Sequence, residues 1–243
     1  MKVIVLTLFP NEVGVLFQRG VLKRAIDADR FQFEVVDLRQ FGSAPHYKVD
    51  DIPFGGGVGM VLRADIMANA IRSIEHYENY RILYTCPKGP RFNQGFATEL
   101  SNESGIILIS GYYEGLDERV FELFPIERVS IGDFVVSSGD LPALMIAEAV
   151  VRLLPGVLGN PNSVQQDSYL TGLLEHPQYT QPRSIDESRV PDVLTSGHHQ
   201  NIKNWQLTQS FKETLIRKPS LLANLNLNST EQKILIDVIV KGD

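Results

Sequence analysis

Short apolar runs alternate with helical patterns along the first 155 residues of the chain. The apolar runs predict strands over Val3–Phe9, Phe33–Leu38, Ile82–Cys86, Ile106–Ser110 and Val129–Ile131, with Phe134–Val136 as a short continuation. Apolar residues at helical spacing predict helices over Glu12–Ala28, Ala64–Tyr77, Asn93–Asn102, Leu116–Leu123 and Pro142–Leu154. Unbroken apolar strands separated by helices indicate an α/β domain with a mostly parallel sheet and helices on both faces.

The last of these helices carries clear signals at both ends. Asp140 is expected to cap its N-terminus, Pro142 suits its first turn, and Pro155-Gly156 stops it. Residues 156–168 are polar and rich in turn formers, which indicates a linker. Beyond the linker, a small and mainly helical second domain is expected, with helices over Trp205–Leu215 and Glu231–Val240 and a shorter piece near Leu221.

Composition narrows the class of protein. Hydrophobic residues make up 43% and charged residues 21% of the chain, and no apolar run is long enough to span a membrane. The N-terminal stretch is interpreted as a first strand and not as a signal peptide. The single Cys86 excludes an intramolecular disulfide and a cysteine zinc site and suits a reducing cytosol. The five histidines show no metal-ligand spacing.

The charge is unevenly distributed along the chain, with a net charge of −6. Residues 1–150 carry 14 Lys and Arg against 20 Asp and Glu, whereas residues 151–243 carry nine of each. A nucleic-acid partner requires a local basic surface, so composition alone argues mildly against one.

Glycine-bearing loops follow three of the predicted strands, at residues 87–91, Gly111–Gly115 and Ile131–Gly139. The crevice beyond the C-terminal ends of parallel strands commonly binds ligands, and glycine lets a ligand approach the backbone closely. The alternative is that these glycines only form tight turns. Acidic residues in and beside these loops favour a neutral or cationic small molecule over a phosphate: Glu114, Asp117, Asp133 and Asp140.

Three further features each allow two interpretations. The glycine cluster Phe54–Met60 is not a dinucleotide fingerprint, which disfavours a nicotinamide oxidoreductase, and is either a substrate-facing loop or a surface connection. Asp167, the only carboxylate of the linker, is either a catalytic base on a closing loop or a cap for the structure after it. Arg152 either interacts with helix C-terminal carbonyls or is oriented toward an oxyanion.

Several motifs in one order resemble the bacterial tRNA (guanine-N1)-methyltransferase family TrmD, which is of the knotted SPOUT type. They span nearly the whole chain: Leu8–Pro10, Asp50–Met60, Tyr113–Arg119, Ser130–Asp133, Leu141–Ala143, Arg152–Gly159, Asp167-Ser168, Gly172–Pro177 and Lys218-Pro219. The resemblance implies a trefoil-knotted catalytic domain over residues 1–158 that binds S-adenosylmethionine, a flexible linker over 159–170, and a helical tRNA-binding domain over 171–243. It also implies a cytoplasmic homodimer with the active site at the subunit interface.

The reaction implied by the resemblance is methyl transfer from S-adenosylmethionine to N1 of guanosine 37 in tRNA, next to the anticodon. Asp167 matches the base of the family, and Arg152 matches its electrostatic partner for O6. Mg2+ is also implied, with Glu114 as the residue near it. The cofactor pocket carried over from the family comprises Tyr84, Thr85, Cys86, Pro87, Gly111, Tyr113, Glu114, Gly115, Ser130, Ile131, Gly132, Phe134, Val135, Val136, Gly139 and Pro142.

Some positions depart from the family pattern. Ser138 and Cys86 stand where glycine and serine are common, and in the C-terminal domain five positions lack the usual residue: Gln178, Gln181, His198, Asn204 and Gln206. Each lost phosphate contact flattens the salt dependence of binding by about one unit of slope. Weaker tRNA binding with the same reaction is therefore expected. Methylation of another RNA guanosine and a non-catalytic RNA-binding protein are the alternatives, and the presence of both Arg152 and Asp167 argues against the second.

Overall fold

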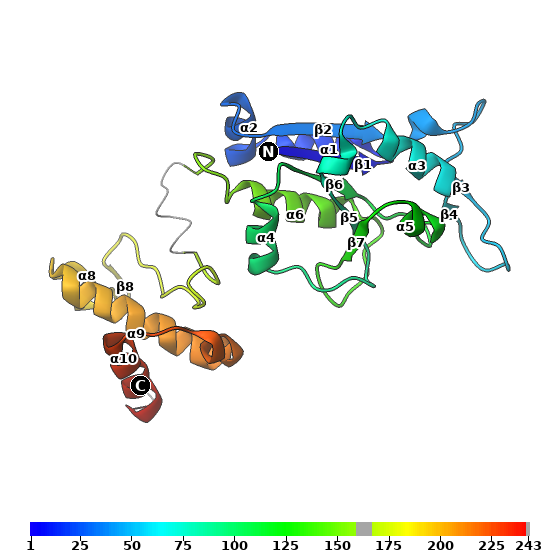
Figure 1. Cartoon of the computed structure of the whole chain (residues 1–243). Helices are drawn as coiled ribbons and strands as arrows, with labels where there is room; N and C mark the ends of the chain where they lie inside the picture. Colours follow the sequence, from blue (N-terminus) through cyan, green and yellow to red (C-terminus); the bar gives the residue numbers. More distant parts are fainter. Residues whose placement is uncertain (159–166, 242–243) are drawn as a thin grey trace. The chain divides into compact units, whose positions relative to one another are not determined.

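The computed structural model of the chain describes residues 1–158 and 167–241 and divides into two compact units, residues 1–161 and 162–243 (Figure 1). Most of the expected flexible linker, residues 159–166, lies outside the described residues. Among the described helices, none combines the length and the apolar character needed to cross a membrane.

A parallel five-stranded sheet forms the centre of the first unit. Its strands lie in the order β2-β1-β6-β5-β7, and every neighbouring pair is parallel. This confirms the expectation of a mostly parallel sheet. The strands are β1 (Lys2–Thr7), β2 (Gln32–Asp37), β5 (Arg81–Thr85), β6 (Gly105–Ile109) and β7 (Ile126–Val129).

Two hydrophobic cores cover the two faces of this sheet, because alternate strand residues point to opposite sides. Val3 and Val5 of β1 belong to one core and Ile4 and Leu6 to the other. The first core is closed by α1 (Pro10–Phe17), α2 (Gly20–Asp27), α4 (Gln94–Leu100) and α6 (Asp140–Val151). The second is closed by η1 (Leu38–Phe41), α3 (Ala64–Arg72), η2 (Tyr77–Asn79) and α5 (Arg119–Leu123) (Figure 1).

The expected helix over Glu12–Ala28 is wrong, since two helices occupy this segment. The helix is interrupted between α1 and α2, where the backbone of Arg19 is extended and Gly20 has a φ of 55°. Phe17 and Leu22 are both buried, and five helical residues would rotate their side chains about 140° apart. The break therefore lets both helices turn an apolar face to the same core.

Two other segments also differ from the expected pattern. Phe134–Val136 is not a strand and is exposed, and α3 ends at Arg72 instead of continuing to Tyr77. The glycine cluster Phe54–Met60 connects β3 (Asp50–Asp51) to β4 (Val61–Leu62), which pair in antiparallel fashion. Four of its glycines have positive φ, which explains why glycine is used there.

The second unit is mainly helical, in agreement with its sequence pattern. Leu173, Phe211 and Val238 form its small core. Its elements are the hairpin β8 (Ser184–Ile185) and β9 (Ser188–Arg189), followed by α8 (Asp192–Thr195), α9 (His199–Arg217), η3 (Pro219–Asn224) and α10 (Ser229–Lys241).

Candidate active site

A cavity of about 340 Å³ lies at the C-terminal ends of three neighbouring strands, β6, β5 and β7. Its walls are the loops that follow these strands. Parallel strands end at the same edge of a sheet, so loops that are far apart in sequence meet there. The volume falls within the range of about 300–1,000 Å³ that is usual for small-molecule sites.

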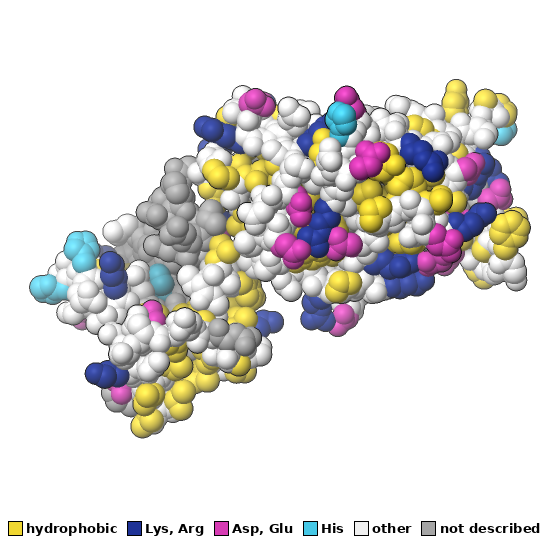
Figure 2. All heavy atoms as spheres, in the orientation of Figure 1, with side chains coloured by type: hydrophobic (Ala, Val, Ile, Leu, Met, Phe, Trp, Pro, Cys, Tyr) yellow, Lys and Arg dark blue, Asp and Glu magenta, His cyan; other side chains and the backbone are white. Residues whose placement is uncertain are grey.

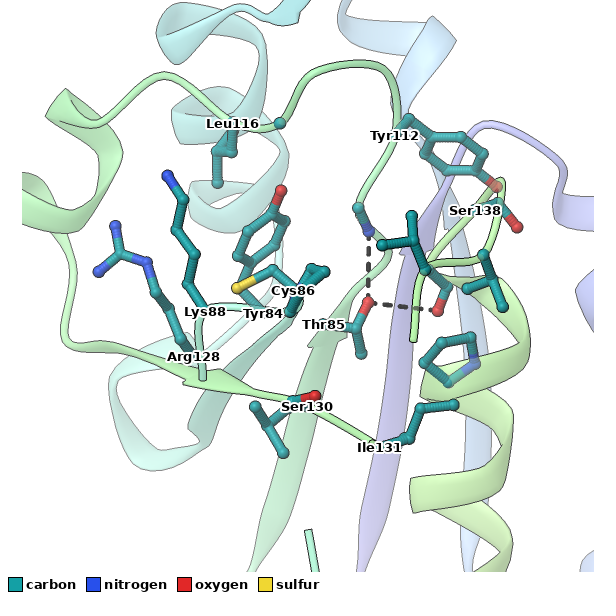
Figure 3. Close-up of a pocket in the computed structure, with 18 of the residues that line it drawn as sticks. Tyr84, Thr85, Cys86, Lys88, Tyr112, Leu116, Arg128, Ser130, Ile131 and Ser138 are labelled. Atoms are coloured by element: carbon teal, nitrogen blue, oxygen red, sulfur yellow. Dashed lines mark hydrogen bonds between the residues drawn. The ribbon is translucent and has the colours of Figure 1, made fainter. Parts of the chain in front are cut away.

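Thr85, the last residue of β5, connects the loops at the base of the cavity (Figure 3). Its side-chain oxygen Oγ1 lies 3.2 Å from the carbonyl oxygens of Ile109 and Gly139 and accepts a hydrogen bond of 3.3 Å from the Gly111 amide. The residue is 4% exposed, so this junction is shielded from solvent.

Gly139 and Gly111 touch backbone to backbone at the same junction. The Gly139 amide donates a hydrogen bond of 2.6 Å to the Gly111 carbonyl. A Cβ atom at Gly139 would lie 2.2 Å from the Gly111 nitrogen and 2.2 Å from Thr85 Oγ1. These contacts leave no room for a side chain, and they explain the glycine at position 139 without any need for an unusual φ.

Every residue of the cofactor pocket implied by the family resemblance lines this one cavity. The structure thus brings together residues of the three glycine-bearing loops, which are far apart in the sequence. Their role in binding a cofactor remains a prediction, since the cavity shows their proximity and not their ligand.

Other lining residues were absent from the sequence-based set. Lys88 and Arg128 lie on the side of Tyr84 and Cys86, whereas Tyr112 and Ser138 lie on the opposite side of Thr85 (Figure 3). Lys88 directly follows Pro87 and could have been found from the loop sequence. The remaining additions are Leu116, Glu118, Phe121, Val129 and Ser137.

The charge of the cavity differs from the acidic character that the loops suggested. Of the four acidic residues considered, only Glu114 lines the cavity. Asp117 pairs with Arg119, Asp133 with Arg91, and Asp140 is buried. Lys88 and Arg128 balance Glu114 and Glu118 in the lining, so the acidity of the loops does not make the cavity itself acidic, and the expectation of a neutral or cationic ligand stays a prediction. Acidic and basic side chains are likewise interspersed on the visible face of the first unit (Figure 2).

The expected N-cap role of Asp140 is also wrong. Gly139 occupies the N-cap position of α6 and Asp140 is the first helical residue. The Asp140 carboxylate instead accepts hydrogen bonds from the hydroxyls of Thr7 and Tyr112. It turns into the protein and not toward the first amides of the helix.

The two predicted catalytic residues are not among the residues that line the cavity. Arg152 stands at the C-cap of α6, and its amide donates to the Glu148 carbonyl. Arg152 is ten residues beyond Pro142, the cavity-lining residue of α6, and so lies about 15 Å from it along the helix axis. Asp167 belongs to the second unit, where it begins a turn whose Leu170 amide donates to the Asp167 carbonyl.

Glu114 is not part of a cluster of metal-ligating side chains in the described residues. Mg2+ requires several oxygen ligands in near-octahedral geometry. Residues 1–158 and 167–241 contain no group of three or more His, Cys, Asp or Glu side chains that could hold a metal ion. The side chain of Glu114 lies instead against Gly59, where a Cβ atom would come within 2.4 Å of Glu114 Oε1. A cage of three or more protein ligands for Mg2+ is therefore absent from the described residues, and the placement of Glu114 near the ion stays a prediction.

Tyr84 forms a wall of the cavity and packs edge-on against Phe121, with ring centroids 5.6 Å apart. Burial raises the pKa of the Tyr84 phenol to about 12, and the nearby Cys86 thiol contributes in the same direction. Burial likewise raises the pKa of Tyr112 and of Tyr113. The phenols of the cavity therefore ionise at a higher pH than a tyrosine in water does.

The raised pKa of Tyr84 predicts a loss of stability in alkali. An unfolded chain ionises this phenol near pH 10, whereas the native state holds its proton up to about pH 12. Between these values the native state binds more protons, so stability falls as the pH rises. We expect the difference in phenolate absorbance between wild type and Tyr84→Phe to have its midpoint near pH 12 in the native state. In guanidinium chloride the midpoint should return to about 10. A native midpoint near 10 would contradict the burial of this phenol.

A second cavity of about 380 Å³ lies in the first unit, and Tyr113 lines both cavities. Its lining is rich in cations, with Arg39, Lys48 and Arg63 as well as His46 and a single carboxylate, that of Asp50. Lys48 and Arg63 are paired with Asp51 and Asp65. The first unit therefore has two adjoining cavities, one of mixed polarity and one with more basic than acidic side chains.

Comparison with known proteins gives matches over nearly the whole chain. The family described as tRNA (Guanine-1)-methyltransferase TrmD matches residues 1–224. A tRNA (guanine-N(1)-)-methyltransferase of Bacillus licheniformis is 46% identical over 235 residues, which cover 96% of this chain and 97% of that protein. The protein of the same name from Staphylococcus carnosus is 44% identical over 235 residues, covering 97% and 96%. That of Desulforamulus reducens is 39% identical over 241 residues, covering 98% and 95%.

Proposed function

The chain belongs to the TrmD family of tRNA (guanine-N1)-methyltransferases, and from this premise we propose that the cavity beyond β5, β6 and β7 binds the methyl donor. The chain is an enzyme that methylates N1 of guanosine 37 in tRNA with S-adenosylmethionine as donor. The observation that carries the assignment of the cavity is the convergence of all the pocket positions implied by the family on one site.

The lining of the cavity fits S-adenosylmethionine in its chemistry. Glycine at positions 111 and 139 keeps the base of the cavity free of side chains, so the donor can approach the backbone of the surrounding loops closely. Leu116, Ile131 and Pro142 provide an apolar surface of the kind that suits an adenine ring. When bound, S-adenosylmethionine supplies an electrophilic methyl group.

We assign the role of general base to Asp167. N1 of guanine carries a proton and is a poor nucleophile at neutral pH, so a base must accept this proton as the N–CH3 bond forms and the S–CH3 bond breaks. A carboxylate can accept it, and the products are N1-methylguanosine in tRNA and S-adenosylhomocysteine. The match of Asp167 to the base of the family supports this assignment.

We assign Arg152 to the stabilisation of negative charge on O6 of the guanine, and with it a homodimeric active site. Arg152 is about 15 Å along α6 beyond Pro142, a residue of this helix that lines the cavity of its own chain, and this separation supports a site completed by a second copy. Exposed apolar side chains beside the cavity favour the same arrangement, because they leave an apolar surface to be covered: Phe134, Val135, Leu141 and Met145.

The remaining parts of the proposal concern the fold and the RNA. The segment after the edge strand β7 returns to Gly111 beside β6 and so crosses the end of β5, which supports the trefoil knot implied by the family. The basic lining of the second cavity supports contact with an anionic substrate next to the donor. We assign tRNA binding to the helical residues 171–243 and the cytoplasm as the location of the enzyme.

A methyl-transfer assay tests this proposal. Purified protein is mixed with labelled S-adenosylmethionine, Mg2+ to fold the RNA, and paired tRNA transcripts that carry G or A at position 37. We expect label only in the G transcript, at N1 of that base. No label in either transcript, with donor binding confirmed by calorimetry, would overturn the assigned substrate and leave the cavity assignment standing.

A further inference from the structure

We propose that Thr7, Tyr112 and Asp140 form a buried clamp that positions the wall of the donor cavity and so sets the affinity for S-adenosylmethionine. The inference rests on the assignment of that cavity to the methyl donor. Thr7 and Asp140 are positioning residues that act through the backbone of the cavity, whereas Tyr112 also lines the cavity itself. They come from the end of β1, the loop after β6 and the start of α6.

The three polar side chains meet in the interior of the first unit. Thr7 is 0% exposed, Tyr112 7% and Asp140 8%. Thr7 Oγ1 donates a hydrogen bond of 2.7 Å to Asp140 Oδ1, and the Tyr112 hydroxyl donates to Asp140 Oδ2. The two hydroxyl oxygens lie 3.2 Å apart. Each carboxylate oxygen thus has its own donor.

The two hydroxyl groups of the clamp supply two donated protons, and a carboxylate at position 140 has one oxygen to accept each of them. Thr7 and Tyr112 each have one hydroxyl proton, and both protons point to Asp140. The Thr7 oxygen is then free to accept the hydrogen bond of 2.9 Å from the Phe9 amide. A buried carboxylate without such donors would be strongly unfavourable. Removal of either hydroxyl therefore leaves one carboxylate oxygen without its donor.

The clamp is joined directly to the cavity wall. Asp140 follows Gly139, whose carbonyl lies 3.2 Å from Thr85 Oγ1 and whose amide bonds Gly111. Tyr112 follows Gly111, and both residues line the cavity. A shift of the Asp140 carboxylate therefore moves the two backbone segments that form the base of the site.

Helix α6 has no side-chain cap at Gly139, which explains why the carboxylate of the clamp stands at residue 140. A cap residue such as Ser or Asp at position 139 would satisfy the first amides of α6. Its Cβ atom would collide with the Gly111 backbone, so the position must be glycine. The side chain of the next residue, Asp140, therefore holds the start of α6 in place through its hydrogen bond with Thr7 of β1. Placement of the carboxylate at a helix N-terminus is also electrostatically favourable.

Calorimetric titration of the purified enzyme with S-adenosylmethionine tests the clamp in three variants. Thr7→Val and Tyr112→Phe each remove one hydroxyl with little change of volume, and Thr7→Ser restores the hydroxyl. We expect the dissociation constant to rise about tenfold in the first two and about twofold or less in Thr7→Ser. Steady-state kinetics should show the same rise in KM for the donor, with little change in KM for tRNA or in kcat.

A matched core variant separates positioning from general loss of stability. Ile71→Ala removes a fully buried side chain of α3 that is not among the residues lining the donor cavity, and it should lower the melting temperature without weakening donor binding. Faster amide exchange over residues 131–138 in Thr7→Val, but not in Ile71→Ala, would support the clamp. Donor affinity within about twofold of wild type in both clamp variants would overturn it. A wild-type enzyme that binds no donor would instead refute the assignment of the cavity.

Discussion

Replacement of Asp167 by Asn should lower the single-turnover rate of methyl transfer by about 10²- to 10⁴-fold, the usual contribution of a general base. Asparagine keeps the size of the side chain and cannot accept the N1 proton as a carboxylate does. Since Asp167 is not among the residues that line the donor cavity, the affinity for S-adenosylmethionine should be unchanged. Rapid-quench measurement with enzyme in excess over tRNA isolates the chemical step.

The control for this variant is Glu187→Gln, which neutralises an exposed acid in the same unit. It should leave the single-turnover rate within about twofold of wild type. An Asp167→Asn enzyme with the full single-turnover rate would eliminate Asp167 as the base.

Substitution of Gly139 by Val should abolish detectable binding of S-adenosylmethionine. The valine Cβ atom would lie 2.2 Å from the Gly111 nitrogen and from Thr85 Oγ1, closer than non-bonded atoms can approach. The backbone segments at residues 111 and 139 must then move apart, which displaces the loops that line the cavity. Isothermal calorimetry measures the loss of binding, and circular dichroism checks that the variant is folded.

Gly14→Ala is the matched control for that substitution. Gly14 lies within α1, and a Cβ atom there meets nothing within 4 Å. Alanine favours a helix interior over glycine by roughly 1 kcal/mol, so this variant should be as stable as the wild type or more stable. Donor affinity retained in Gly139→Val would show that residues 111 and 139 are not in contact in the working enzyme.

Three strands of the central sheet, β1, β5 and β6, were predictable because burial on both faces imposes a continuous apolar run. β1 and β6 agree with the expected segments to within a few residues. The position of the cavity was predictable for a related reason, since three loops follow three strands of one parallel sheet. The strands thus follow from the local sequence, and the position of the cavity follows from the rule that ligands bind at the C-terminal ends of parallel strands.

Other features were missed because they depend on tertiary contacts. The break between α1 and α2 follows from the five-residue spacing of Phe17 and Leu22, which a search for helical periodicity passes over. Asp140 has the sequence of a cap and instead reaches Thr7, which is 133 positions away. Arg128 was missed because β7 begins at Ile126, earlier than its apolar residues suggested. Each of these features depends on contacts with residues that are distant in the sequence.

The contact of Gly139 with Gly111 has a consequence for the synthesis of the chain on the ribosome. All five strands of the sheet have emerged once Val129 is free, yet the base of the cavity closes only when Gly139 arrives. A ligand that binds the closed cavity and not the open chain stabilises only first units that have completed this last step. At a hundred times its dissociation constant, such a ligand contributes about 2.7 kcal/mol. Bound methyl donor should therefore protect the completed first unit against proteolysis, and should not protect a chain whose cavity is still open.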